Sequence, residues 1–192
     1  MQNTTMIELP ERVKEILDTI MEAGYEAYAV GGCIRDSILG RNPNDWDITT
    51  SASPYEIKEL FRRTVDTGIQ HGTVTVMMDK EGFEVTTYRI DGDYKDGRHP
   101  SEVTFTASLK EDLRRRDFTI NAMMYDYQNG KLIDYYQGRE DIKNKCLKMV
   151  DEKTFYEDPL RVLRLAQFMS RFEFQVDLKT KEICQKMVNE GA

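Results

Sequence analysis

The chain has 192 residues, of which 40% are hydrophobic and 32% are charged, an ordinary balance for a soluble globular protein. Its 27 basic and 34 acidic residues give a net charge of −7, which argues against a general nucleic-acid coat protein but allows a local basic site. With no run of about 18 apolar residues, no signal-peptide pattern at its start and three widely spaced cysteines, we expect a cytoplasmic protein with reduced thiols and no membrane span.

The front half of the chain mixes helical and strand patterns. Apolar residues recur at helical spacing before Gly24, and later segments alternate or are rich in β-branched residues. The predicted elements are, in chain order, a helix over 9–24, a strand over 25–30, a turn and short helix over 31–40, a strand over 45–50, a helix over 53–63, and a hairpin of two strands over 72–78 and 83–89.

The back half is mostly helical. A polar loop is expected over 91–102, a helix begins near residue 108, and a short hairpin turns at Asn129-Gly130. The fold class is therefore α+β, with a domain over 1–150 and a helical segment over 151–192. The last helix has an apolar face without an obvious partner, so we expect a further region after Ala192.

Gly31 and Gly32 follow a predicted strand and open a short helix that carries Arg35. Glycines let the backbone approach a ligand closely, and a helix start with a nearby arginine suits a phosphate group. The alternative is a plain strand-to-helix turn with a surface arginine, because a glycine pair is a weak signal.

Asp45 and Asp47 lie two residues apart, so on a strand their carboxylates point to the same face. Paired carboxylates suit Mg²⁺, which prefers oxygen ligands and retains substrate phosphates in its shell. Glu84, in the middle of a later strand, is a candidate third acid. The alternative is a solvated polar strand face.

Asp158, Arg161 and Arg164 recur every three residues, a spacing that makes them neighbours on a helix. Cytosine and adenine share an edge with an amino donor beside a ring-nitrogen acceptor, so one carboxylate and one guanidinium would accept both bases and reject guanine and uracil. Alternatively, Asp158 is a helix N-cap before Pro159, paired with a surface arginine.

The segment AYAVGGCIRDSILGRNPNDWDIT resembles the head-domain signature of the class II tRNA nucleotidyltransferases. These are the CCA-adding enzymes and their bacterial poly(A) polymerase relatives, members of the DNA polymerase beta-like superfamily. The resemblance covers roughly residues 28–174 and continues through the blocks DTGIQHGTVTV, FEVTTYR, LRRRDFTINAM, IDYYQGREDI and FYEDPLRVLR. It implies a polymerase-beta-like head, with a mixed sheet flanked by helices, followed by the start of a helical neck.

The resemblance also implies roles for individual residues. Asp45 and Asp47 match the metal-binding carboxylates, and Glu84 matches the third acidic residue of the catalytic face. Gly32 and Arg35 match contacts to the nucleotide phosphates.

Further along, Arg116 and Arg164 match nucleotide-binding arginines, and Asp117 and Asn121 fall in the block that reads the sugar. Asp158 and Arg161 match the pair that contacts the incoming base. Relatives often carry a third arginine where this chain has Gln167, which puts the role of that position in doubt. The polar loop over 91–102 resembles that of enzymes able to add the terminal adenosine.

The implied reaction is transfer of CMP or AMP from CTP or ATP to the 3′ end of tRNA with Mg²⁺, as in CCA addition. A poly(A) polymerase, or a relative that adds only CC or only A, shares most of these motifs. A non-catalytic nucleotide-binding module is a rival from another class. The sequence does not indicate the oligomeric state or the tRNA-binding surface.

Overall fold

A computed structural model describes residues 7–88 and 109–191 of the chain. The polar loop expected over 91–102 lies outside these residues. Within the described ranges, none of the helices combines the length and apolar character needed to cross a membrane.

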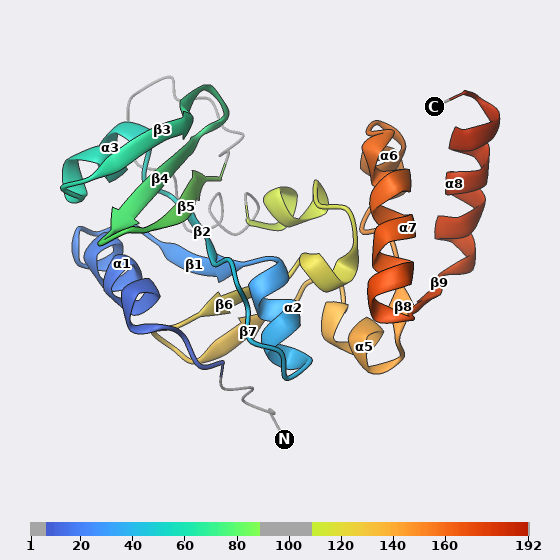
Figure 1. The fold of residues 1–192 in the computed structure, drawn as a ribbon, viewed down its shortest axis with the longest axis horizontal. Coiled ribbons are helices and arrows are strands. Elements are labelled where there is room, and N and C mark those ends of the chain that lie inside the picture. The colour runs from blue at the N-terminus through green and yellow to red at the C-terminus, as the bar shows by residue number, and fades with distance from the viewer. Residues whose placement is uncertain (1–6, 89–108, 192) are drawn as a thin grey trace.

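A seven-stranded mixed sheet forms the centre of the N-terminal part (Figure 1). Its spatial order is β3-β4-β5-β2-β1-β6-β7, and every neighbouring pair is antiparallel except β2 and β5, which are parallel. The strands are β1 (Ala27–Val30), β2 (Asp47–Thr50), β3 (Thr64–Gly68), β4 (Thr73–Met78), β5 (Glu81–Thr87), β6 (Met124–Asp126) and β7 (Lys131–Ile133).

Three helices of the N-terminal part correspond to those predicted over 9–24, 31–40 and 53–63, and a fourth agrees with the helix predicted to begin near residue 108. Residues 109–114 are helical, and the other elements are α1 (Glu11–Glu22), α2 (Gly32–Ile38), α3 (Pro54–Leu60), η1 (Ile69–His71), η2 (Thr119–Asn121) and α5 (Gly138–Lys143). The start of α3 has a local cause: Ser53 and Glu56 form a reciprocal capping box, and Pro54 occupies the first turn.

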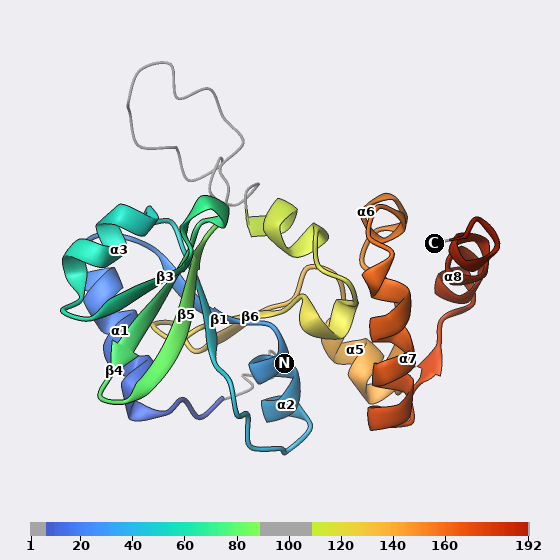
Figure 2. The same ribbon diagram turned by 45° about the horizontal axis from the view of Figure 1, so that its top comes forward.

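The C-terminal helices lie at one end of the molecule, beyond α2 and α5 as seen from the sheet (Figures 1 and 2). They are α6 (Glu152–Tyr156), α7 (Leu160–Phe172) and α8 (Leu178–Asn189). β8 (Cys146–Leu147) precedes α6 in the chain, β9 (Gln175–Val176) follows α7, and the two strands form a small parallel sheet.

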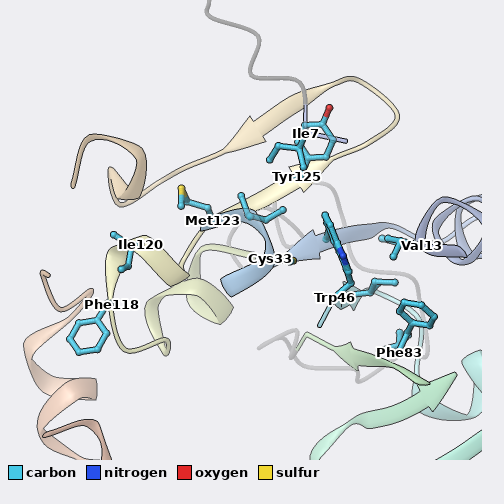
Figure 3. Packing of buried hydrophobic residues seen from close by; sticks show 14 of the residues in the cluster. Ile7, Val13, Cys33, Trp46, Phe83, Phe118, Ile120, Met123 and Tyr125 are labelled. Atoms are coloured by element: carbon cyan, nitrogen blue, oxygen red, sulfur yellow. The ribbon is translucent and has the colours of Figure 1, made fainter. Parts of the chain in front are cut away.

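The main hydrophobic core packs α1 against one face of the sheet. In Figure 3, Val13 of α1 lies near Trp46 and Phe83, and all three are buried. The same cluster extends to Phe118, whose ring centroid lies 5.7 Å from that of Phe155 and 5.5 Å from that of Phe168. Hydrophobic contacts therefore cross the boundary between 1–150 and 151–192, and the division into two domains there stays a prediction.

The structure corrects two predicted boundaries and adds three strands that the sequence does not predict. The strand expected over 45–50 begins only at Asp47, so Asp45 precedes it. The helix expected to continue to residue 63 ends at Leu60, and β3 follows in a segment where the sequence predicts no strand. β8 and β9 are likewise absent from the prediction, because two-residue strands carry no periodic signal.

Candidate active site

The parallel pairing of β2 with β5 brings two of the predicted carboxylates together. Asp47 stands directly opposite Glu84 in the register of these strands. Their strand neighbours Ile48 and Phe83 are buried in the main core, so Asp47 and Glu84 point to the opposite face of the sheet. Asp45 is exposed, and the buried Trp46 separates it from Asp47. The expected carboxylate cluster is thus centred on Asp47.

Asp47 lies in an unfavourable environment for a charge. Burial raises the pKa of its carboxyl group, the neighbouring charges of Glu84 and Asp45 raise the pKa further, and Arg116 opposes them. In residues 7–88 and 109–191, no basic side chain forms an ion pair with Asp47. A carboxylate in this position would gain from a bound cation.

The described residues contain no group of three or more His, Cys, Asp or Glu side chains that could hold a metal ion by themselves. Magnesium, however, is usually held by one or two carboxylates together with waters and substrate phosphates. The all-oxygen donor set of Asp45 and Asp47, and the uncompensated charge on Asp47, fit such a shared site.

A cavity of about 330 Å³ opens beside Asp47. Five arginines and two aspartates line it, so it is locally positive in a chain whose net charge is −7. This excess of positive charge suits an anionic ligand such as a nucleoside triphosphate. The lining residues are Gly32, Arg35, Asp47, Arg115, Arg116, Asp117, Asn121, Arg161, Arg164 and Phe168.

Arg35 is 5% exposed, and α2 holds it at the wall of this cavity. Its Nε atom donates to Asp36 over 3.0 Å, and Nη1 donates to Asn121 over 2.5 Å. A Cβ atom on Gly32 would lie 3.1 Å from Nη2, so the guanidinium passes directly over a bare stretch of backbone. Arg35 is therefore fixed in place before any ligand arrives.

Gly31 is needed for two separate reasons. Its φ of +86° lies in the left-handed region, which other residues rarely adopt. A Cβ atom there would also stand 3.0 Å from Nη1 of Arg116. The Nε atom of Arg116 is buried and has no hydrogen-bond partner among the described residues. Arg116 therefore lies beside Gly31 with one N–H donor that a ligand could use.

Asp117 is a buried carboxylate that joins the two sides of the cavity. Its Oδ1 atom accepts hydrogen bonds from the backbone N–H of Phe118 over 2.7 Å and from Asn121 over 3.1 Å. Its Oδ2 atom lies 2.9 Å from Nη2 of Arg164, which comes from α7. Asp117 is only 3% exposed, so this ion pair ties α7 to the N-terminal part.

Asp158 and Arg161 stand at the start of α7. Oδ1 of Asp158 accepts from the backbone N–H of Leu160 over 3.1 Å, and Oδ2 lies 3.8 Å from Nε of Arg161. The guanidinium of Arg161 also donates to the backbone carbonyls of Thr154 and Arg115. Asp158 therefore accepts a backbone hydrogen bond at the start of α7 and lies near Arg161, as the N-cap alternative predicts, but the N-cap residue itself is Pro159.

The predicted site residues fall into three groups. Six of them line the cavity described above: Gly32, Arg35, Asp47, Arg116, Arg161 and Arg164. Asp158 lines a neighbouring hollow of about 420 Å³, which shares Arg115 and Arg161 with the first. Asp45 and Glu84 line neither hollow, and their charges raise the pKa of Asp47.

The sequence prediction omits Arg115 and Phe168 from the cavity wall. The signal for Phe168 is its spacing, since it follows Arg161 by seven residues and Arg164 by four and so shares their helix face.

Comparison with known proteins gives consistent similarities. The family described as the poly(A) polymerase head domain matches residues 27–148. A CCA-adding enzyme of Lactiplantibacillus plantarum is 49% identical over 174 residues, or 90% of this chain and 42% of that protein. A CCA-adding enzyme of Listeria innocua is 52% identical over 168 residues, or 86% of this chain and 42% of that protein.

Solved structures agree with these similarities. The CCA-adding enzyme of Bacillus stearothermophilus in complex with CTP superposes with a TM-score of 0.77 at 36% identity, covering 91% of this chain and 43% of that one. The Thermotoga maritima CCA-adding enzyme complexed with tRNA has a TM-score of 0.79 at 26% identity, covering 95% and 43%. The α+β fold predicted from the sequence is confirmed. The chain spans about two fifths of the length of the relatives it matches.

Proposed function

Since the chain belongs to the family of the poly(A) polymerase head domain, we propose that it carries the catalytic site of a CCA-adding tRNA nucleotidyltransferase. The proposed reaction transfers CMP from CTP and AMP from ATP to the 3′ hydroxyl of tRNA and releases pyrophosphate. The observation that carries the proposal is the arginine-lined cavity beside Asp47, itself paired in register with Glu84.

Asp45 and Asp47 would hold a divalent cation, for which we propose Mg²⁺. When bound, the cation supplies Lewis acidity and lowers the pKa of the attacking hydroxyl group. Glu84 keeps the strand face acidic beside Asp47, which strengthens the attraction for a cation at this point.

Arg35, Arg116 and Arg164 would bind the triphosphate. Arg35 is already held by Asp36 and Asn121, so its charge needs little reorganisation when phosphate oxygens arrive. Such preorganised positive groups stabilise the charge that shifts to the leaving pyrophosphate.

Asp158 and Arg161 would recognise the base. The Asp158 carboxylate accepts from an amino group, and the Arg161 guanidinium donates to a ring nitrogen, which suits cytosine and adenine alike. Arg161 is anchored by the carbonyls of Thr154 and Arg115, so its position is defined by the backbone. The hollow that holds Asp158 adjoins the phosphate cavity, as the two ends of one nucleotide require.

The near alternative is a poly(A) polymerase, because the matching family carries that description. A relative that adds only CC or only A is a second near alternative. A module that binds nucleotides without catalysis is a remote one. We further propose a cytoplasmic location, where tRNA is processed.

Incorporation assays separate these possibilities. The protein is incubated with Mg²⁺ and with tRNA ending before, within or after CCA, and receives CTP alone, ATP alone or both. CCA addition predicts CMP incorporation on tRNA that lacks CCA, and AMP only after CC. AMP addition in long runs on every RNA would instead indicate poly(A) synthesis, and nucleotide binding without incorporation would indicate a non-catalytic module.

Asp45→Ala and Asp47→Ala are expected to abolish incorporation of both nucleotides, since each removes a carboxylate from the cation site. Asp66→Ala is the matched control, because Asp66 is exposed and pairs with Lys58 on the surface. Retained incorporation in Asp47→Ala would refute the assignment of the metal site.

A further inference from the structure

Two aromatic rings on α7 contact the guanidinium of Arg35, which belongs to α2. The Cζ atom of Arg35 lies 5.2 Å from the ring centroid of Phe168 and 4.9 Å from that of Phe172. The two rings are four residues apart and stack on each other, with centroids 5.6 Å apart and planes inclined by 19°. A guanidinium placed against aromatic rings is attracted by their π electrons, most strongly where water is excluded.

The hydrogen bonds of Arg35 indicate what the rings do. Nε donates to Asp36 and Nη1 donates to Asn121, at distances of 3.0 Å and 2.5 Å. Nη2 has no hydrogen-bond partner among the described residues and lies beside Gly32, which lines the cavity together with Arg35. Asp36 and Asn121 thus hold two edges of the guanidinium, and the two rings pack against it.

We propose that Phe168, supported by Phe172, is a positioning residue that aims Nη2 of Arg35 into the cavity for the triphosphate of the incoming nucleotide. This inference rests on the proposed function, because it assigns Arg35 to a phosphate-binding role. It makes the phosphate contact of α2 depend on α7, the helix that also carries Arg161 and Arg164.

Phe168 is the better residue for a test. Phe172 also contacts Arg41 and Arg171, each with Cζ 4.9 Å from its ring centroid, so its replacement would disturb three arginines. Among the described residues Phe168 contacts one cation, Arg35. Its ring also packs edge-on against Phe118, so a control must account for lost packing.

The experiment measures CTP binding in the presence of Mg²⁺ by titration calorimetry. Phe168→Leu, which removes the ring but keeps an apolar side chain, is expected to weaken binding about five- to tenfold. Phe168→Tyr keeps the ring and should bind within about twofold of the unsubstituted chain. Phe174→Leu is the matched control, because Phe174 packs against Phe172 and contacts no arginine in the described part of the chain.

A double-mutant cycle separates positioning from general packing. Arg35→Lys replaces the planar guanidinium by an ammonium group that the rings cannot align in the same way. In that background, Phe168→Leu should change CTP affinity by less than about twofold, because its effect passes through Arg35. An equal loss in both backgrounds would overturn the inference.

The NMR signal of the Arg35 Nε–H group gives a readout that does not need a ligand. Aromatic rings shift the resonances of nearby protons, so Phe168→Leu should move this signal, whereas Phe174→Leu should leave it in place. An unmoved signal, or unchanged CTP affinity in Phe168→Leu, would overturn the inference and leave the proposed function standing. If the unsubstituted chain does not bind CTP, the proposed function and this inference both fail.

Discussion

Replacing Asp47 by asparagine is expected to stabilise the fold while it removes the function. Asparagine has nearly the same shape as aspartate but carries no charge. Burial and the charges of Glu84 and Asp45 raise the pKa of Asp47, and Arg116 offsets them only in part. Cross-strand side-chain pairs change stability by roughly 0.2–1 kcal/mol, and like charges directly opposite each other destabilise the sheet. With the contribution of burial, we expect Asp47→Asn to raise the free energy of unfolding by about 1 kcal/mol.

The dependence on pH follows from the direction of the pKa shift. Folding raises the pKa of Asp47 above its ordinary value of 3.8, so the folded chain binds this proton more tightly than the unfolded chain does. Stability therefore falls as the pH rises from 3.8 through the raised pKa, and the full penalty remains above it. The advantage of Asp47→Asn should thus be complete at pH 7 and should vanish near pH 3.8.

Thermal unfolding followed by circular dichroism measures the effect. At pH 7 without metal, Asp47→Asn should unfold about 2–4 °C above the unsubstituted chain, the shift expected from 1 kcal/mol in a protein of this size. With Mg²⁺ and CTP the order should reverse, because the chain that retains the carboxylate binds the cation and the nucleotide more tightly and is stabilised more by them. Asp66→Asn, which alters an exposed ion pair with Lys58, should change little in either condition. A lower melting temperature for Asp47→Asn without metal would refute the electrostatic reasoning.

Three further substitutions, one of them with a control, test other parts of the site and the fold. Asp158→Ala should reduce the preference for CTP and ATP over GTP and UTP in competition binding; an unchanged preference would count against base recognition. Gly31→Ala should weaken CTP binding, because its Cβ atom would lie 3.0 Å from Arg116, whereas Gly24→Ala, with a φ of +94° and open surroundings, should lower only stability, by about 1–2 kcal/mol. Equal CTP affinity in these two variants would contradict the proposed role of the turn. Gly138→Ala should destabilise the fold by about 3 kcal/mol in chemical denaturation, because its Cβ atom would overlap the backbone oxygen of Thr119; near-native stability would show that the start of α5 shifts to make room.

Much of the fold is predictable where the local signal is strong. The buried stripe of α1, the capping box of α3 and the β4–β5 hairpin all follow from spacing, caps and β-branched residues. β3 is different, because it is an edge strand with three exposed central residues and an irregular register against β4. Its pairing, rather than its own pattern, makes it a strand.

The sequence predicts which residues belong to the site, but it does not predict which of them contact one another. The sequence indicates that Asp47 and Glu84 belong together, and the register of two parallel strands brings them opposite each other. It does not indicate that Asn121 binds Arg35 or that Phe168 covers it, since those contacts depend on how α2 and α7 meet in space. The placement of Asp158 in a separate hollow has the same origin.

The β8–β9 pair has a mechanical consequence for α7. The backbone N–H of Gln175 donates to the carbonyl of Lys145 over 2.8 Å, and that of Asp177 donates to the carbonyl of Leu147 over 2.9 Å. These bonds join the end of the α6–α7 segment to β8, the strand that precedes it. The segment that contains α6 and α7 is therefore held at both of its ends, by β8 and by β9, and not at one end alone. Because the ion pair between Arg164 and Asp117 also holds α7 to the N-terminal part, the helix is fixed both at its base and along its length, which keeps Arg161 and Arg164 at the wall of the cavity.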